Sequence, residues 1–346
     1  MARKFLWGSL GLAPVAILVH YAVHPGSNTD FVLAALALIP LAWLIGEATE
    51  HAAHHTGAGI GGFLNATFGN APELIIALFA VADGLTEVVR GSLTGSVVGN
   101  LLLVLGFSLV FGGRGELDRQ SSFVSLGLVG LATLLFLVPA IPGFDGDPER
   151  DSIVRLSLIP AVLLLVVYVV ATYISLRRHH QLHVSDEPSE MRAWSLATSL
   201  AVLGAATVVT ALIAEIMVGA LDEFADSAGL SDFFVAAVIV AIVGNAAEHG
   251  GAVVVAARGK IKLAAEIALA SSAQVAVFLV PAVTLLAWLI EPLALSFRPV
   301  ELVVLGGATV VTGALLAQGR SSRLRGALLI AAYVLAAVAF FVAGDR

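Results

Sequence analysis

Long apolar runs, separated by short polar connections, cover nearly the whole chain of 346 residues. An α-helix needs about 20 apolar residues to cross roughly 30 Å of hydrocarbon, and eleven stretches of the chain are of that kind. The expected spans are 5–23, 31–50, 62–82, 88–112, 121–141, 153–176, 194–220, 232–257, 263–290, 299–317 and 325–343. This pattern predicts an all-α integral membrane protein with 11 transmembrane helices.

The composition agrees with a membrane protein and excludes several other classes. Hydrophobic residues make up 59% of the chain and charged residues only 12%, which is too few for the polar surface of a soluble domain. The net charge of −7 and the short basic runs indicate no nucleic-acid partner, and the absence of cysteine excludes disulfides and thiolate metal sites. We expect the first apolar run, to Val23, to be a retained helix because no clear cleavage site of a signal peptide follows it.

The distribution of basic residues predicts the orientation in the membrane. Thirteen of the 18 Lys and Arg residues fall at the N-terminus or in the even-numbered connections. The other five fall on the opposite side, beside acidic connections, and are Arg90, Arg150, Arg155, Arg298 and Arg346. By the positive-inside rule, the N-terminus is cytoplasmic and the C-terminus lies outside. The short connections fit a prokaryotic plasma membrane, with a vacuolar membrane as the alternative.

One short motif occurs twice inside the apolar runs. GNAPE at residues 69–73 returns 175 residues later as GNAAE at 244–248. LIGE at 44–47 matches LIAE at 212–215 at an offset of 168, and Asn100 matches Gln274 at an offset of 174. The chain therefore reads as two copies of one five-helix unit. Since each unit has an odd number of crossings, the copies have inverted topology, which is an architecture of secondary transporters.

These repeats divide the chain into four parts. We expect residues 1–30 to form an additional N-terminal transmembrane helix, 31–176 the first inverted repeat (helices 2–6), 177–193 a cytoplasmic linker, and 194–346 the second inverted repeat (helices 7–11).

Each copy of the motif carries a glutamate where the sequence predicts little or no water. A charged group in a membrane span costs roughly 2.5–3.5 kcal/mol even on the more lenient scale, so each acid is a functional candidate. The competing interpretation is a glutamate that only pairs with a polar neighbour for packing, and we expect no embedded Lys or Arg as its partner. A pseudo-two-fold axis in the membrane plane would bring Glu73 and Glu248 together near the midplane.

The motifs offer the ligands of a hard divalent cation such as Ca2+, which takes six to eight oxygens. The glutamates would supply charge, and backbone carbonyls would be freed where glycine and Pro72 weaken the helix. The asparagines would add side-chain support. Histidine-rich or thiolate sets are not found within these spans, so zinc and copper are disfavoured. The predicted metal site comprises Glu73, Glu248, Gly69, Gly244, Asn70 and Asn245.

Protons would compete with the cation for the same oxygens. Two acids in one small dry site cannot comfortably both be ionised without a cation, so the empty site would hold protons. A divalent ion would expel them. A site that holds either the cation or protons is sufficient for exchange if the protein alternates access. We expect transported Ca2+ and H+, with Mn2+ as an alternative ion, and no cofactor.

Further polar residues near the motifs are candidates for proton transfer, gating or support of the site. Amides and small hydroxyl residues often serve only to pack membrane helices, which is the competing interpretation for most of this group. A histidine can relay protons near neutral pH. The two glutamates of the LIGE and LIAE segments would line access vestibules, or else be solvated helix ends. The group comprises His249, Gln274, Asn100, Ser96, Ser271, Ser272, Glu47 and Glu215.

A cluster of Glu50, His51, His54 and His55 follows the second expected helix. It lacks the His-Glu-x-x-His order of a zinc protease, since the glutamate precedes the first histidine. We expect an exposed polar connection, with a surface that gathers ions or senses pH as the alternative. No ordered nucleophile and base is found, and we do not expect an enzyme.

Five segments resemble the Ca2+/H+ (cation/proton) exchanger family of the calcium/cation antiporter superfamily, within a resemblance over about 31–343. They are GEATE at 46–50, GNAPELI at 69–75, GSVVGNLLLVLG at 95–106, GNAAEH at 244–249 and SSAQVAVFLVP at 271–281. The resemblance implies that Glu73 and Glu248 coordinate calcium and exchange protons, supported by His249 and Gln274. Sodium-driven relatives typically carry an additional acid where this chain has Gln274, which favours protons. The chain departs from the commonest pattern at Gly99, where serine is frequent, and at Ala270, where glycine is frequent.

The residues and the resemblance together predict a secondary antiporter that exports cytoplasmic Ca2+ against H+ entry by alternating access. Within transport, an Na+/Ca2+ exchanger or a broader divalent exchanger is the alternative. A passive cation channel would also place glutamates at the midplane, but it would carry ions without counter-movement of protons.

Overall fold

The computed structural model describes residues 2–181 and 194–346, and it leaves out the side chains of residues 2–4, 57–63, 65–66, 175–181 and 247–249. Almost all regular structure in this part is helical, and short π-helical segments (η) interrupt several helices. The helices are α1 (Ala2–Ser9), α2 (Leu12–Leu18), η1 (Val19–Val23), α3 (Ser27–Phe68), α4 (Ala71–Ala82), α5 (Thr86–Val98), η2 (Gly99–Val104), α6 (Leu105–Gly112), α7 (Arg119–Gly143), α8 (Asp151–Gln181), α9 (Leu196–Gly219), α10 (Leu221–Ala228), α11 (Asp232–Phe234), η3 (Val235–Val240), α12 (Ala241–Gly244), α13 (Ala246–Ala257), α14 (Ile261–Gln274), η4 (Val275–Leu279), α15 (Val280–Ala287), α16 (Pro299–Leu316) and α17 (Arg323–Ala343).

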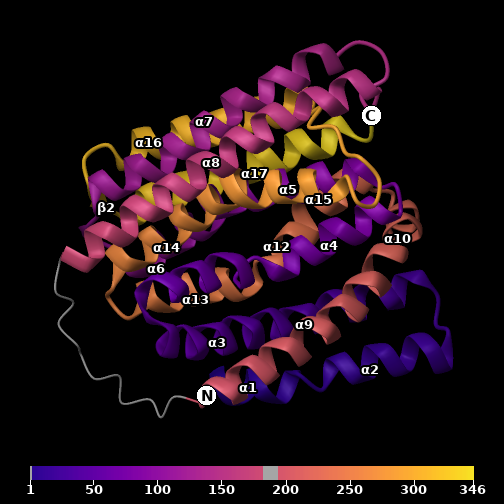
Figure 1. The fold of residues 1–346 in the computed structure, drawn as a ribbon, viewed down its shortest axis with the longest axis horizontal. Helices are drawn as coiled ribbons and strands as arrows, with labels where there is room; N and C mark the ends of the chain where they lie inside the picture. Colours follow the sequence, from indigo (N-terminus) through magenta and orange to yellow (C-terminus); the bar gives the residue numbers. More distant parts are fainter. Residues whose placement is uncertain (1, 182–193) are drawn as a thin grey trace.

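Two long helical spans lie at the centre of the bundle. In the span Thr86–Gly112, which contains α5, η2 and α6, 83% of the most apolar window is buried, and in Ile261–Ala287 the share is 67%. Helices α7, α8, α16 and α17 lie along one side of these spans, and α2, α3 and α9 lie along the other (Figure 1). The outer helices expose large apolar side chains such as Leu134, Val169 and Leu335. That arrangement is expected of a protein whose surrounding solvent is lipid.

Nine helices in the described residues are long and apolar enough to cross a membrane, or ten if Leu221–Ala228 and Asp232–Gly244, bent by 108°, form one span. Nine of the eleven expected ranges correspond to these helices. The other two, 62–82 and 232–257, contain the repeated motif and are interrupted. The mostly helical membrane fold is therefore confirmed, and the count of eleven stays a prediction.

Both interruptions fall at the asparagine of the motif. Asn70 precedes α4 with φ −98° and ψ 15°, and Asn245 separates α12 from α13 with φ −89° and ψ 4°. Pro72 lies in the first turn of α4, where a missing N–H is tolerated. The helix therefore breaks before the proline.

Two connections expected from the sequence are helical in the structure. The backbone of α3 continues through the cluster at 50–55 to Phe68, and the acidic stretch that begins at Leu221 forms α10. Helix α8 similarly continues beyond residue 176 to Gln181. Polar composition suggested loops there, but isolated polar residues do not stop a helix that packs against neighbouring helices.

Helices α4 and α13, and likewise α6 and α15, begin and end 175 residues apart. Helices α4 and α13 both have 12 residues, and α6 and α15 both have eight. The turns after α4 and α13 each use a glycine with positive φ, Gly84 at 72° and Gly259 at 84°. At a spacing of 175 residues, Gly99 and not Asn100 corresponds to Gln274. The expected correspondence of Asn100 with Gln274 is therefore shifted by one residue.

A small sheet joins two connections at one end of the bundle. Strand β1 (Gly115–Glu116) pairs antiparallel with β2 (Arg320–Ser321), with Gly115 opposite Ser321 and Glu116 opposite Arg320. The backbone N–H of Leu117 extends this pairing by donating to Gly319 O at 2.9 Å. The connection after α6 is thereby fixed to the connection after α16.

Candidate functional site

The glutamate of the first motif lies against the glycine of the second. A Cβ atom placed on Gly244 would lie 3.3 Å from Glu73 Cγ and 3.7 Å from both Cδ and Oε1. Glu73 is only 8% exposed. The two copies of the motif, 175 residues apart, therefore meet inside the bundle, and the expected approach of Glu73 to Glu248 stays a prediction.

Amide and hydroxyl side chains join four helical elements beside this contact. Asn245 Nδ2 donates to Ser96 Oγ at 2.8 Å and to Ala241 O at 3.0 Å. Asn100 Nδ2 donates to Asn245 Oδ1 at 3.3 Å and to Ser271 Oγ at 3.0 Å. All four side chains are buried. The network brings residues of α5, η2 and α14 to the asparagine at which the second motif breaks its helix.

One oxygen of this network is left for a ligand. Asn100 Oδ1 is buried and accepts no hydrogen bond from the described residues. Leaving a buried acceptor unsatisfied costs about 1–3 kcal/mol, and amide oxygens are good ligands for Ca2+. Asn100 belongs to the π-helical segment η2, and such segments occur frequently at functional sites. The π-helical geometry could not be predicted from the sequence.

The position of α5 depends on a close backbone contact. A Cβ on Gly95 would lie 2.0 Å from Ala237 O, so only glycine lets α5 approach η3 this closely. On another face of α5, Ser272 Oγ donates to Val97 O at 3.1 Å. These two contacts hold Ser96 within reach of Asn245.

The other residues of the predicted metal site lie at the interruptions. Asn70 is buried at the N-terminus of α4, and Gly69 beside it is half-buried. The backbones of Glu248 and His249 lie in the first turns of α13, but their side chains lie outside the described part of the structure. Gln274 is half-buried at the end of α14.

The two vestibule candidates lie in different surroundings. Glu47 Oε1 is 3.6 Å from His51 Nε2, one turn further along α3. Glu215 is exposed on α9. No described contact links either residue to Asn100 or Asn245.

The histidine cluster lies on helix α3, where Glu50, His54 and His55 are exposed as expected and His51 is buried. His51 is 4% exposed and stacks on Trp194 with ring centroids 4.5 Å apart. His55 Nε2 lies 2.7 Å from Trp194 O. The cluster therefore joins α3 to the residues before α9. Among the side chains the structure describes, no group of three His, Cys, Asp or Glu is placed to hold a metal.

The sequence missed a second buried polar cluster. Arg90 and Arg298, which we placed on the outer side of the membrane beside acidic connections, are 2% and 7% exposed. Arg90 pairs with Glu149, and its Nη2 lies 3.6 Å from Glu87 Oε1. Arg298 Nε lies 3.7 Å from Glu301 Oε2. The signal that could have found this cluster is acidic residues close to each arginine in the sequence.

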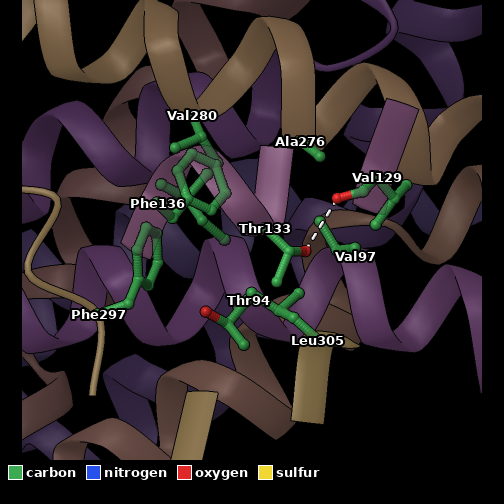
Figure 2. Close-up of a pocket in the computed structure, with 10 residues that line it drawn as sticks. Thr94, Val97, Val129, Thr133, Phe136, Ala276, Val280, Phe297 and Leu305 are labelled. Carbon is green, nitrogen blue, oxygen red and sulfur yellow. Dashed lines mark hydrogen bonds between the residues drawn. The ribbon is translucent and has the colours of Figure 1, made fainter. Parts of the chain in front are cut away.

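A small apolar cavity lies beside this cluster. It has a volume of about 10 Å³, the size of one water, and is lined by residues of α5, α7, η4, α15 and α16 together with Phe297. Thr94 and Thr133 supply its polar atoms, and Thr133 Oγ1 donates to Val129 O at 2.9 Å (Figure 2). Thr94 Oγ1 also donates to Glu301 Oε1 at 3.2 Å. The cavity is too small for a substrate pocket.

Comparisons with known proteins agree with this architecture. A Ca(2+)/H(+) antiporter, ChaA, of Bacillus subtilis (strain 168) is 38% identical over 331 residues, covering 92% of this chain and 94% of the relative. A Ca(2+)/H(+) antiporter of Synechocystis sp. is 35% identical over 356 residues, covering 96% and 95%. The solved structure of native YfkE has a TM-score of 0.83 at 35% identity and covers 99% of this chain and 100% of that one. The family described as sodium/calcium exchanger protein matches residues 30–177 and 198–342. The chain belongs to the sodium/calcium exchanger protein family.

Proposed function

We propose that this protein is a secondary antiporter that exchanges Ca2+ for H+ across the membrane. The observation that carries the proposal is the contact of the Glu73 side chain with Gly244, beside an amide network that contains an unsatisfied oxygen, Asn100 Oδ1. Relatives at 35–38% identity over nearly the whole chain are Ca2+/H+ antiporters.

The described groups that could bind an ion at the site are mainly oxygens, and this suits calcium as the transported substrate. Glu73 supplies a carboxylate, Asn100 an amide oxygen, and the helix breaks at Asn70 and Asn245 turn backbone groups away from the helical ladder. We assign Glu248, Gly69 and Gly244 to the same site, with His249, Gln274, Ser96, Ser271 and Ser272 as supporting or proton-transferring residues. Glu47 and Glu215 are assigned to the two access routes. Mn2+ remains the second candidate ion.

Proton coupling follows from competition for these oxygens. A cation stabilises ionised carboxylates, whereas the empty site keeps them neutral because isolated charges are costly in a dry environment. Each crossing then carries either the cation or protons. A proton gradient directed inward thereby drives calcium outward.

The architecture we propose is one N-terminal helix followed by two inverted five-helix repeats. The 175-residue spacing of α4 from α13 and of α6 from α15 supports this, as does a break at the same asparagine in each copy. If the interrupted stretches 62–82 and 232–257 each cross once, they and the nine continuous helices make up the eleven crossings that we propose. We propose a bacterial plasma membrane location with a cytoplasmic N-terminus, a cytoplasmic linker at 177–193 and an outer C-terminus.

Flux measured in vesicles tests the proposal. The purified chain is reconstituted, a proton gradient is imposed, and calcium uptake is followed with sodium absent on both sides. We expect uptake that collapses when an ionophore dissipates the proton gradient. Calcium movement that requires sodium would identify a sodium/calcium exchanger, and movement without proton counterflow would identify a channel.

The pH dependence of binding tests the shared site separately. Because protons and calcium compete for the same carboxylates, calcium should bind more tightly as pH rises between about pH 6 and pH 8. Calorimetric titration of the purified protein at several pH values measures this. Constant affinity over that range contradicts competition.

A further inference from the structure

A wide groove lies beside the two-stranded sheet, at the end of the molecule where β2 is labelled in Figure 1. Its volume is about 850 Å³, and arginines and leucines form most of its lining. The arginines are Arg114, Arg320 and Arg325, and the leucines are Leu315, Leu324 and Leu328. Charged and apolar side chains therefore share one opening.

Three arginines and one acid, Glu116, line the groove, so its lining carries a net positive charge. Arg114 and Arg320 are exposed, and their guanidinium groups form no ion pair or hydrogen bond with the described residues. Glu116 lies opposite Arg320 in the sheet register, but the described residues show no ion pair between them. Arg325 Nη2 donates to Gln318 Oε1 at 2.5 Å, which fixes the direction of that side chain.

Neighbouring acids and the adjacent helix end do not cancel this charge. The carboxylate of Asp118 already has partners in the protein. It lies 3.2 Å from Lys262 Nζ. The backbone N–H of Ser121 and the side chain of Lys262 both lower its pKa. Helix α17 begins beside the groove at Ser322, and a helix N-terminus carries partial positive charge. The groove therefore has an excess of positive charge.

Arginines at the opposite end of the bundle have partners within the protein. Arg90 and Arg298 pair with acids, and Arg346 Nη1 donates to Ser296 O at 3.0 Å. Among the described residues, Arg114 and Arg320 thus lack the partners that Arg90, Arg298 and Arg346 have.

The apolar side of the groove belongs to membrane-spanning helices. Leu315 lies near the end of the span Pro299–Leu316, while Leu324 and Leu328 lie in the first turns of the span Arg323–Ala343. Leu324 is 70% exposed and Leu328 46% exposed. The groove therefore extends from the depth of lipid headgroups into the depth of acyl chains, and a soluble anion would not use its leucines.

We propose that this groove binds an anionic phospholipid, with Arg114 and Arg320 contacting the phosphate and one acyl chain lying along Leu324 and Leu328. Basic pockets between membrane helices are suited to such headgroups. Bound lipid would join the connection after α6 to the start of α17. This binding does not depend on calcium exchange.

Native mass spectrometry of the detergent-purified full chain tests the proposal, with phosphatidylglycerol and phosphatidylcholine as probes. We expect preferential retention of phosphatidylglycerol. The double variant Arg114→Ala/Arg320→Ala should weaken its binding roughly thirtyfold, because each arginine near a lipid surface contributes about fivefold. The matched control is Arg155→Ala, which removes another exposed arginine, 75% exposed and 4.0 Å from Asp151, outside the groove. It should change binding less than twofold.

Two further arms separate lipid from free anion and from misfolding. Inorganic phosphate should not displace the lipid at millimolar concentration, and Leu324→Ala/Leu328→Ala should weaken lipid binding while leaving the thermal midpoint in intrinsic tryptophan fluorescence unchanged. Equal retention of phosphatidylglycerol by the arginine variant and the wild type overturns the proposal. Displacement by inorganic phosphate overturns the lipid assignment in favour of a soluble anion. Because the readout is lipid binding, failure of calcium exchange would leave this result interpretable.

Discussion

Two buried polar clusters contact the same helix, α5, and differ in the side chains that surround their acids. Beside the contact of Glu73 with Gly244, the hydrogen-bonded side chains are the amides and hydroxyls of Asn100, Asn245, Ser96 and Ser271. Around Glu301, they are the guanidinium groups of two arginines and the hydroxyl of Thr94. Ser96 and Thr94 are two residues apart on α5, so one helix serves both clusters.

The difference teaches how a buried acid is used. An arginine cancels the charge of a carboxylate permanently and leaves no room for an exchangeable ion, so the Glu301 cluster can only hold the fold together. Amides and hydroxyls orient ligands without cancelling charge. Amide and hydroxyl oxygens can also bind a cation, which suits the exchange that we propose for the Glu73 site.

The largest expected effect is on transport, from Glu73→Gln. Glutamine keeps the volume and removes the charge that calcium and protons share, so calcium flux should fall to the level of empty vesicles. The thermal midpoint should stay the same or rise, because a neutral amide is cheaper to bury than a carboxylate. Flux in proteoliposomes and unfolding followed by tryptophan fluorescence measure both. Proton-driven flux that survives this change would falsify the role of Glu73.

Arg90→Ala should lower stability and leave calcium binding nearly unchanged, which is the opposite of the effect expected for Glu73→Gln. Removing one partner of a buried ion pair costs about 3–5 kcal/mol, because Glu149 and Glu87 lose their counter-charge. The midpoint of thermal unfolding should fall steeply, while calcium affinity per folded molecule changes little.

The control for Arg90 is its paired acid. In Arg90→Met/Glu149→Gln both charges are removed, and the double variant should recover part of the lost stability. Equal instability of the single and double variants would show that the effect is packing and not charge. A large loss of calcium affinity in Arg90→Ala would remove the distinction between the two clusters.

The sequence identified one of these clusters and missed the other for a physical reason. Glu73 stood out because an acid in an apolar run is rare. The repeat predicted that it meets Glu248, and the structure shows it against Gly244 of the same motif. Arg90 and Arg298 lie close to span ends, where arginine usually faces water, so their burial could be learned only from tertiary packing.

The fold, like the buried clusters, could be predicted only in part. Apolar runs gave the membrane helices, since length and hydropathy are local properties of the sequence. The continuation of α3 to Phe68 and the π-helical segments depend on contacts between distant helices. Those features could therefore be recognised only in the three-dimensional structure.

A smaller effect is expected from Gly95→Ala, which links the two clusters through the position of α5. The new Cβ would lie 2.0 Å from Ala237 O, and overpacking of this kind costs about 1–3 kcal/mol. Displacement of α5 should also lengthen the 2.8 Å contact of Asn245 with Ser96 and weaken calcium binding. Thermal unfolding and calcium titration measure the two effects.

Gly204→Ala on α9 is the matched control, because nothing lies within 4 Å of its added Cβ. It should leave calcium binding unchanged and stabilise the helix by about 0.5–1 kcal/mol. If both alanine variants behave alike, the close approach of α5 to η3 has no role in shaping the site.

The smallest effects should come from two neighbouring substitutions on α5, Thr94→Val and Ser96→Ala. Valine removes the 3.2 Å hydrogen bond from Thr94 to Glu301, whose carboxylate keeps the bond from the Arg298 backbone, so stability should fall by about 1 kcal/mol. Alanine at residue 96 leaves Asn245 Nδ2 with only the Ala241 carbonyl, which loosens an amide beside the exchange site. Calcium affinity should therefore fall several-fold in Ser96→Ala and stay unchanged in Thr94→Val.

This pair is the sharpest test of the comparison because both variants remove one hydroxyl from the same helix, two residues apart. Differences in helix propensity or depth in the membrane are small between them, so opposite readouts would come from the cluster each hydroxyl faces. Calcium titrations at two pH values should show an altered pH dependence only for Ser96→Ala. If Thr94→Val alters that dependence as well, Glu301 takes part in proton binding and the arginines do not isolate it from exchange.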